Sequence, residues 1–247
     1  MERSKYFIVF ILLFMSCVTL NASHKQDIYN AYINNNMQKW ALVIDDMQLH
    51  RHQSKSFKME LINYQYGYIA WCIGNGKKDV AEKYLALAEK SLSELEVLKY
   101  NVSLVQSYQS AFYGFRIGLN ILKAPFIGIK SIDCAKLAMK TDGENPYGYV
   151  QYGNSQYYMP KAFGGSKKVA IDYFKKAQTL MEKHKMQIVE DWNYLSLLTL
   201  LAQAYAETEN FELAKAYYQK ILKIEPNYIW VKNELYPQFL KTYTNKK

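Results

Sequence analysis

The clearest pattern of apolar and polar positions lies near the C-terminal end of the chain, within residues 195–226. Apolar residues recur there every three or four positions, the spacing that places side chains on one face of a helix. The polar run 207–210 separates two such stripes, and Pro226 ends the second. The first stripe contains Leu198, Leu201, Ala202 and Tyr205, and the second contains Phe211, Ala214, Tyr218, Ile221 and Leu222. Two short amphipathic helices cannot bury both stripes alone, so the pattern predicts a stack of neighbouring helices.

Weaker copies of the second stripe occur earlier in the chain. Each copy has residues at spacings of four and three with small residues at its ends, which lets paired helices approach closely. The copies are formed by Ala81, Leu85 and Ala88, by Ser131, Ala135 and Ala138, and by Ala170, Phe174 and Ala177. Because the intervals between the copies are uneven, we expect an all-α fold that is an irregular solenoid of stacked antiparallel helix pairs.

Starting at Leu195, the C-terminal segment resembles a tetratricopeptide repeat (TPR) over the full length of that motif. Large residues stand at its fourth, seventh and eleventh positions, small residues at the eighth and twentieth, an aromatic residue at the twenty-fourth and a proline at the thirty-second. Two positions depart from the motif, because Glu209 replaces the usual turn glycine and Ile221 replaces a small residue. The resemblance implies a TPR-like solenoid in which the first helix of each pair lines a concave groove.

The other segments complete this expected organisation. Residues 23–54 predict an irregular N-terminal helix pair, and residues 55–226 predict degenerate TPR-like repeats, clearest over 195–226. Residues 227–247 predict a C-terminal capping helix and a loose tail, with Pro237 ending or kinking the helix.

Residues 1–22 have the pattern of a secretory signal peptide. Arg3 and Lys5 give a positive start, a short apolar run follows, and small residues surround Ala22. The run is about half the length that a membrane-spanning helix needs, and no later stretch is long and apolar enough to span a membrane. We therefore expect cleavage near Ala22 and export to the periplasm or cell envelope, with lipid anchoring at Cys17 as the alternative.

Composition narrows the classes of function. Aromatic residues make up 15% of the chain, including 23 tyrosines, whereas glycine (11) and proline (5) are sparse, which disfavours a turn-rich all-β fold. The formal net charge changes from +9 to +8 when Glu2, Arg3 and Lys5 leave with the signal. An exported protein is not expected to bind nucleic acid, so the lysines are either solvated or face anionic envelope surfaces, acidic proteins or polysaccharides.

Cys72 and Cys134 lie in apolar helical contexts, and we expect buried thiols rather than a disulfide.

No motif in the sequence assembles a catalytic or metal centre. His50 and His52 are two residues apart, which directs them to different sides of a helix, and His24 and His184 are isolated. The Gly-x-Ser-x-Gly elbow of hydrolases and the phosphate-loop pattern are both missing. We therefore expect a protein that is not an enzyme and uses no cofactor or metal.

The stretch MPKAFGGSKK, residues 159–168, allows two interpretations. A glycine pair before a helix that starts with two lysines could hold an anion. However, Pro160 and Ser166 favour a connector, because the proline ends one helix and the serine caps the next. We interpret the stretch as an enlarged connector, with Phe163 packed beneath the helix pair. Together with LKAPFIGIKS, residues 122–131, it resembles loops of secreted, uncharacterised TPR proteins from Bacteroidetes-type bacteria.

Candidate binding residues follow from transferring the TPR groove positions onto two predicted first helices, which start at Pro146 and Leu195. The helix from Pro146 is rich in tyrosine, a side chain suited to recognition at small entropic cost. The candidate groove residues are Tyr147, Asn154, Tyr157, Tyr158, Thr199, Gln203 and Glu207.

Two functions fit these expectations. The leading hypothesis is a non-enzymatic scaffold of the periplasm or envelope, whose concave groove binds an unidentified protein partner within a larger assembly. The alternative is a solute-binding accessory protein of a transporter, in which the helical stack holds an apolar or aromatic small molecule.

Overall fold

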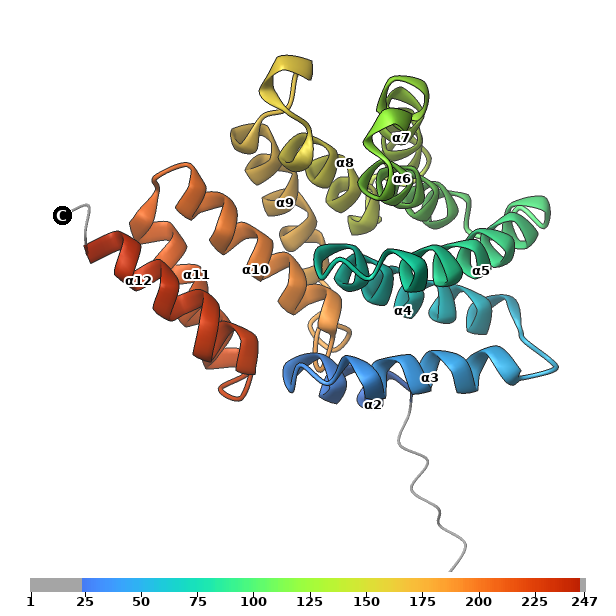
Figure 1. Cartoon of the computed structure of the whole chain (residues 1–247), viewed down its shortest axis with the longest axis horizontal. Helices are drawn as coiled ribbons and strands as arrows, with labels where there is room; N and C mark the ends of the chain where they lie inside the picture. Colours follow the sequence, from blue (N-terminus) through green and yellow to red (C-terminus); the bar gives the residue numbers. More distant parts are fainter. Residues whose placement is uncertain (1–23, 245–247) are drawn as a thin grey trace, which may run out of the picture.

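The computed structural model describes residues 24–244, and all regular structure in this range is helical. Five helix pairs follow one another along the chain and stack side by side (Figure 1). The pairs are α2 (His24–Ile33) with α3 (Met37–Leu49), α4 (Lys55–Gly74) with α5 (Lys78–Val97), α6 (Val102–Leu119) with α7 (Ala124–Thr141), α8 (Pro146–Tyr158) with α9 (Lys167–Glu182), and α10 (Trp192–Glu207) with α11 (Phe211–Ile224). The prediction of an all-α solenoid of stacked pairs is confirmed. The expected signal peptide and Cys17 lie outside the described residues.

The C-terminal cap shows how the chain accommodates Pro237. A π-helical turn, η3 (Val231–Leu235), comes directly before the last helix, α12 (Tyr236–Thr244). Pro237 follows this π-turn closely, in a helix that continues from the turn without a break. The π-turn absorbs the irregularity that a proline inside a continuous helix would cause.

Close packing within the pairs rests on small residues. The buried sets on α5 and α9 are Ala81, Leu85 and Ala88, and Ala170, Phe174 and Ala177. Gly153 on α8 faces the ring of Phe174, and a Cβ at Gly153 would overlap that ring. The phenylalanine therefore fills the space that the glycine leaves.

The first helix closes the stack by packing against segments far along the chain. Lys25 Nζ donates to the carbonyl oxygen of Val189 at 2.7 Å, and the Tyr29 hydroxyl donates to Glu225 at 3.0 Å. Helix α2 also contacts α10, beside which it lies in Figure 1. An open solenoid has no such contact between its ends, and the sequence pattern did not predict it.

Four aromatic side chains, Tyr32, Trp40, Trp192 and Tyr228, form what we call the closure junction. The ring of Trp192, the first residue of α10, lies 5.1 Å from Trp40 and 5.8 Å from Tyr32. Tyr228 also packs on Tyr32, at 5.0 Å. Gly67 on α4 leaves room for both tryptophans, because a Cβ there would lie 2.7 Å from Trp192 and 2.8 Å from Trp40. The junction thus joins both halves of the chain in one apolar contact.

Asp191 lies next to this junction and caps the N-terminus of α10. Its carboxylate accepts the backbone N–H of Asn193 at 3.0 Å. Burial raises the pKa of the carboxyl group above its ordinary value, although the hydrogen bonds from Asn193 and the charge of Lys25 act in the opposite direction. Because the pKa is higher in the folded state, the ionised carboxylate opposes folding at neutral pH, and this cost disappears as the pH falls.

We therefore expect Asp191→Asn to raise the free energy of unfolding at pH 7. Asparagine keeps the cap, because its amide oxygen still accepts from Asn193, and it removes the buried charge. This gain in the free energy of unfolding should shrink as the pH falls toward 3.8, the ordinary pKa of an aspartate carboxyl group. At that pH the wild-type carboxyl group is protonated as well. Urea unfolding of both proteins across this pH range measures the difference. As a control, Asp191→Ala loses the cap and should be less stable than Asp191→Asn by about 1 kcal/mol. An asparagine variant less stable than wild type at pH 7 would count against this account.

The cysteines of the described residues, Cys72 and Cys134, are free thiols. Cys72 is buried and Cys134 is half-buried. Burial raises the pKa of Cys134 to about 11 and raises the pKa of Cys72 above its ordinary value.

Within residues 24–244, no helix combines the length and apolar character that crossing a membrane requires.

Candidate functional site

Two enlarged connectors protrude at one edge of the molecule. The first joins α6 to α7 and contains the 3-10 turn η1 (Ile121–Lys123), and the second joins α8 to α9 and contains the 3-10 turn η2 (Lys161–Phe163). Both lie at the upper edge in Figure 1, one beside α7 and the other above α8 and α9. In a stack of antiparallel pairs the connectors within pairs fall on one edge, so both lengthened connectors lie along the same edge of the molecule, as two separate projections in Figure 1.

The connector between α8 and α9 is a defined turn. Helix α8 ends at Tyr158, shortly before Pro160, and the hydroxyl of Ser166 caps the first turn of α9. Gly164 has a φ of 94°, a conformation that favours glycine. The N–H of Gly165 donates to the carbonyl oxygen of Pro160 at 3.2 Å. The chain here has the helix–connector–helix structure that the sequence predicts.

The two connectors expose large apolar side chains and lysines. We call this region the connector surface, with the apolar residues Ile121, Leu122, Phe126, Ile129, Tyr158 and Phe163 and the basic residues Lys123, Lys130, Lys161, Lys167 and Lys168. Phe126 and Phe163 are each 77% exposed. The expectation that Phe163 packs beneath the helix pair is therefore wrong, because η2 directs its side chain into solvent. Segments 120–131 and 158–169 contain no acidic residue, so the surface is both apolar and positively charged.

Two of the candidate groove residues, Tyr157 and Glu207, contact each other. The Tyr157 hydroxyl donates to Glu207 Oε1 at 2.7 Å, and Lys167 forms an ion pair with the same carboxylate. The Lys167 ammonium also lies 5.3 Å from the centre of the Tyr157 ring. Burial, followed by the hydrogen bond to Glu207, raises the pKa of Tyr157 above its ordinary value. These contacts link α8, α9 and α10 next to Tyr158, which is 69% exposed.

Asn154 lies one turn earlier on α8, among residues that the sequence did not single out. Its amide nitrogen lies 3.4 Å from the hydroxyl of Tyr66 on α4 and 3.2 Å from Gln151 Oε1. Tyr66 in turn stacks on Phe115 of α6, with ring centroids 5.4 Å apart. Asn154 Oδ1 and Gln151 Nε2 are buried and have no hydrogen-bond partner among the described residues. Buried polar atoms are usually paired, so this position suits a water molecule or a polar group of a ligand.

Thr199 and Gln203 on α10 are less accessible. Thr199 is 2% exposed, and its hydroxyl donates to the carbonyl oxygen of Leu195 at 2.8 Å. Tyr228, from the segment after α11, lies near Thr199. Gln203 is half-buried, one turn before Glu207. We therefore leave Thr199 out of the proposed binding surface and keep Gln203 at its margin.

Tyr147 lies at the start of α8, away from the other tyrosine candidates. Its ring packs 6.1 Å from that of Tyr108. It lines a cavity of about 20 Å³ together with Tyr66, Trp192 and Asn193, which has room for about one water molecule. This part of the solenoid interior is filled by the protein's own aromatic side chains.

Sequence reasoning found Tyr158 but missed the rest of the connector surface. The available signal was a set of large apolar residues in the two connectors and the adjoining helix ends, in segments that carry lysines and no acidic residue. Turns are usually polar, so apolar side chains there are candidates for binding. Tyr66 and Phe115 had no such signal, because their helical spacing is that of ordinary core residues.

Comparisons with known proteins identify a sequence family and a solved structure similar to this chain. Residues 195–228 match the family model of the tetratricopeptide repeat. Among solved structures, the fold is similar to the HusA haemophore from Porphyromonas gingivalis, with a TM-score of 0.60 and 18% sequence identity over 77% of this chain and 97% of that chain. No curated protein matches the chain in sequence. This similarity supports the stacked helical fold. The protein is a TPR-like α-solenoid, with a tetratricopeptide repeat at residues 195–228 and further helix pairs stacked before it.

Proposed function

We propose that the protein is an exported, non-catalytic binding protein that captures an apolar, negatively charged ligand on the connector surface. The observation that carries this proposal is the exposure of six large apolar side chains beside four exposed lysines, Lys123, Lys130, Lys161 and Lys168, with no acidic residue in either connector. The fifth lysine of the surface, Lys167, is paired with Glu207. Exposed apolar groups of this kind mark binding sites, and the lysines favour a ligand with negative charge. The signal-peptide pattern of residues 1–22 supports export.

This proposal modifies the solute-binding alternative. A ligand would bind at the open edge of the solenoid, because the cavity beside Tyr147 has room for about one water molecule. The similar fold of the HusA haemophore suggests haem as one ligand of the right chemistry. Haem is a flat, largely apolar ring with two carboxylates, so its ring suits Phe126, Tyr158 and Phe163 and its carboxylates suit the lysines.

Titration with haemin, followed by its absorbance, tests this proposal. We expect saturable binding to the wild-type protein and a loss of affinity in the double variant Phe126→Ser, Phe163→Ser. Loss of contact with two rings costs about 3 kcal/mol, or roughly a hundredfold in Kd. The control variant Val97→Ser, Met186→Ser changes two residues that are also highly exposed, at 80% and 84%, but lie outside the connectors. Absence of saturable binding, or an equal loss in the control, would refute the proposal for haemin.

A protein-binding scaffold is the second candidate, and a specific observation supports it. Tetratricopeptide repeats commonly mediate protein interactions, and Tyr158 is exposed next to Tyr157, Glu207 and the partly unpaired Asn154. Crosslinking in the cell envelope, followed by mass spectrometry of the purified tagged protein, distinguishes the two candidates. A stoichiometric protein partner that is lost in the variant Asn154→Ala, Tyr157→Phe but retained in Phe126→Ser, Phe163→Ser would favour the scaffold.

A further inference from the structure

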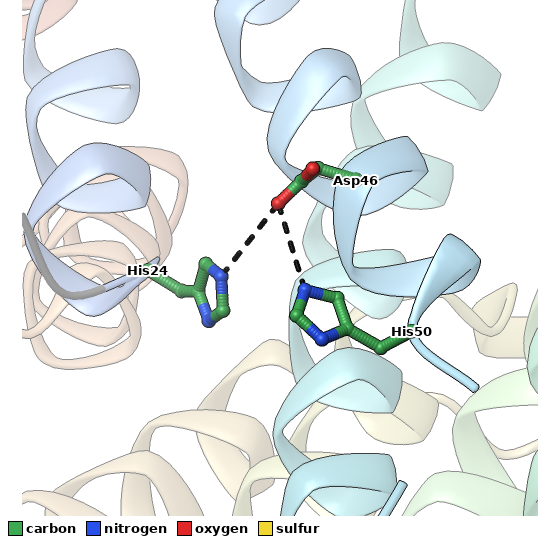
Figure 2. A group of neighbouring side chains, drawn as sticks. All are labelled: His24, Asp46 and His50. Carbon is green, nitrogen blue, oxygen red and sulfur yellow. Dashed lines mark ion pairs between the residues drawn. The ribbon is translucent and has the colours of Figure 1, made fainter. Parts of the chain in front are cut away.

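Two histidines and an aspartate meet where the first helix pair opens toward solvent. Figure 2 shows the side chains of His24 and His50 on either side of the Asp46 carboxylate. Both Nε2 atoms approach the same oxygen, Asp46 Oδ2, at 4.0 Å from His24 and 3.9 Å from His50. One ligand atom from each residue lies within 4.8 Å of the other two.

Helix pairing explains this meeting, which sequence spacing does not reveal. His24 is the first residue of α2, and His50 follows the last residue of α3. Because the two helices are antiparallel, the start of α2 lies beside the end of α3. Asp46 is one turn before His50 on the same face of α3. His24 is therefore not isolated from the other histidines, as its sequence position indicated.

Phe57, in the first turn of α4, positions both imidazoles. Its ring centroid lies 5.8 Å from that of His24 and 5.3 Å from that of His50. The two imidazoles are nearly perpendicular to each other, with centroids 6.2 Å apart. Aromatic contacts of this type restrict ring orientation. They hold each Nε2 atom toward the aspartate, so the three groups need little reorganisation to act together.

The three groups have the chemistry of a transition-metal site. Zinc binds imidazole nitrogen and carboxylate oxygen at about 2.0–2.2 Å, which places neighbouring ligand atoms of a tetrahedral site about 3.3 Å apart. The two separations from Asp46 Oδ2 exceed this value by less than 1 Å, and the Asp46 side chain is 69% exposed and able to move. An open depression of about 700 Å³, lined in part by His50 and Gln48, adjoins the group and leaves room for water as a further ligand. Lys58, the lysine of this depression, is paired with Glu94.

We propose that His24, Asp46 and His50 bind one divalent transition-metal ion of the zinc type, which fastens the start of α2 to the end of α3. The proposal is independent of the connector surface, which lies at the opposite edge of the molecule in Figure 1. The metal would stabilise the N-terminal pair, and a ligand that binds only the folded state raises the unfolding temperature.

The test is calorimetric titration of the exported protein with ZnCl₂, with purification through a tag that contains no histidine. We expect saturable binding of one zinc ion and a rise in unfolding temperature with zinc. His24→Ala, Asp46→Asn and His50→Ala should each weaken binding by at least about tenfold, the size of effect seen even for outer-shell changes. His184→Ala is the matched control, because His184 is exposed and lies outside both the group and the adjoining depression. Cobalt binding gives a second readout through its visible absorption.

Three results would overturn the proposal. The first is the absence of saturable zinc binding to the wild-type protein. The second is an equal loss of affinity in the His184 control, which would indicate scattered surface binding. The third is a loss in His24→Ala alone, with Asp46→Asn and His50→Ala unchanged, which would indicate binding at the N-terminus of the chain. Circular dichroism of each variant checks that the helical fold is retained.

Discussion

Gly165→Ala is expected to destabilise the protein strongly through a single methyl group. A Cβ at this position would overlap the carbonyl oxygen of Met159 and lie 2.6 Å from its carbonyl carbon. These are backbone atoms at the end of α8, so they cannot move aside as a flexible side chain does. Relieving the overlap requires the connector to change course, and the hydrogen bond from Gly165 to Pro160 would be lost. We expect the free energy of unfolding to fall by about 3 kcal/mol or more, at the upper end for added bulk in a packed site.

Gly164→Ala is the matched control for this prediction. Gly164 has a φ of 94°, but open space surrounds the position of its missing Cβ. Its replacement should cost only the backbone strain of a left-handed conformation, about 1–2 kcal/mol. Urea unfolding of both variants gives the comparison. If Gly164→Ala proved the more damaging change, close approach of the backbone would not be the constraint in this connector.

Trp192→Ala is expected to loosen the closure of the solenoid. Trp192 is 5% exposed, packs on Trp40 and Tyr32, and donates from its indole N–H to Asn63 at 3.0 Å. Truncating a buried tryptophan typically costs about 3–5 kcal/mol. Because Trp192 joins α2 to α10, hydrogen exchange in residues 24–33 should accelerate more than exchange in α11.

Trp71→Ala provides the control for Trp192. Trp71 is half-buried on α4 and stacks on Tyr68, with Lys77 above its ring. Its truncation should lower the free energy of unfolding by less than Trp192→Ala does. It should leave hydrogen exchange in α2 unchanged. Unaltered protection of α2 in Trp192→Ala would mean that other contacts, such as Lys25 with Val189, suffice to hold the closure.

The sequence predicted those features of the fold that depend on neighbouring residues. The stripes of α10 and α11 and the cap at Ser166 follow from spacings of a few residues, so their pattern is visible in the chain itself. Exposure of Phe163 was not predicted, because it depends on the path of the η2 turn. The burial of Thr199 was not predicted either, since it depends on how the neighbouring elements pack against α10.

The candidate site was predictable to a similar extent. Transfer of TPR groove positions placed Tyr157 and Glu207 in one region, and the structure brings them into contact. The same transfer could not identify Tyr66, which reaches Asn154 from α4. His24 and His50 meet only because α2 and α3 run antiparallel, and a linear spacing rule cannot express that relation.

The closure of the solenoid by α2 has a consequence for how the chain folds. Solenoids with contacts only between neighbouring repeats can begin folding at any repeat and can lose terminal repeats with modest cost. Here the first helix binds residues more than 160 positions later in the chain, as in the pairing of Lys25 with Val189. Such distant contacts carry a large loop-closure entropy and slow folding. Helix α2 precedes α10 in the chain but can dock only once α10 has formed, so deletion of α10 and α11 should leave α2 without the surface on which it packs.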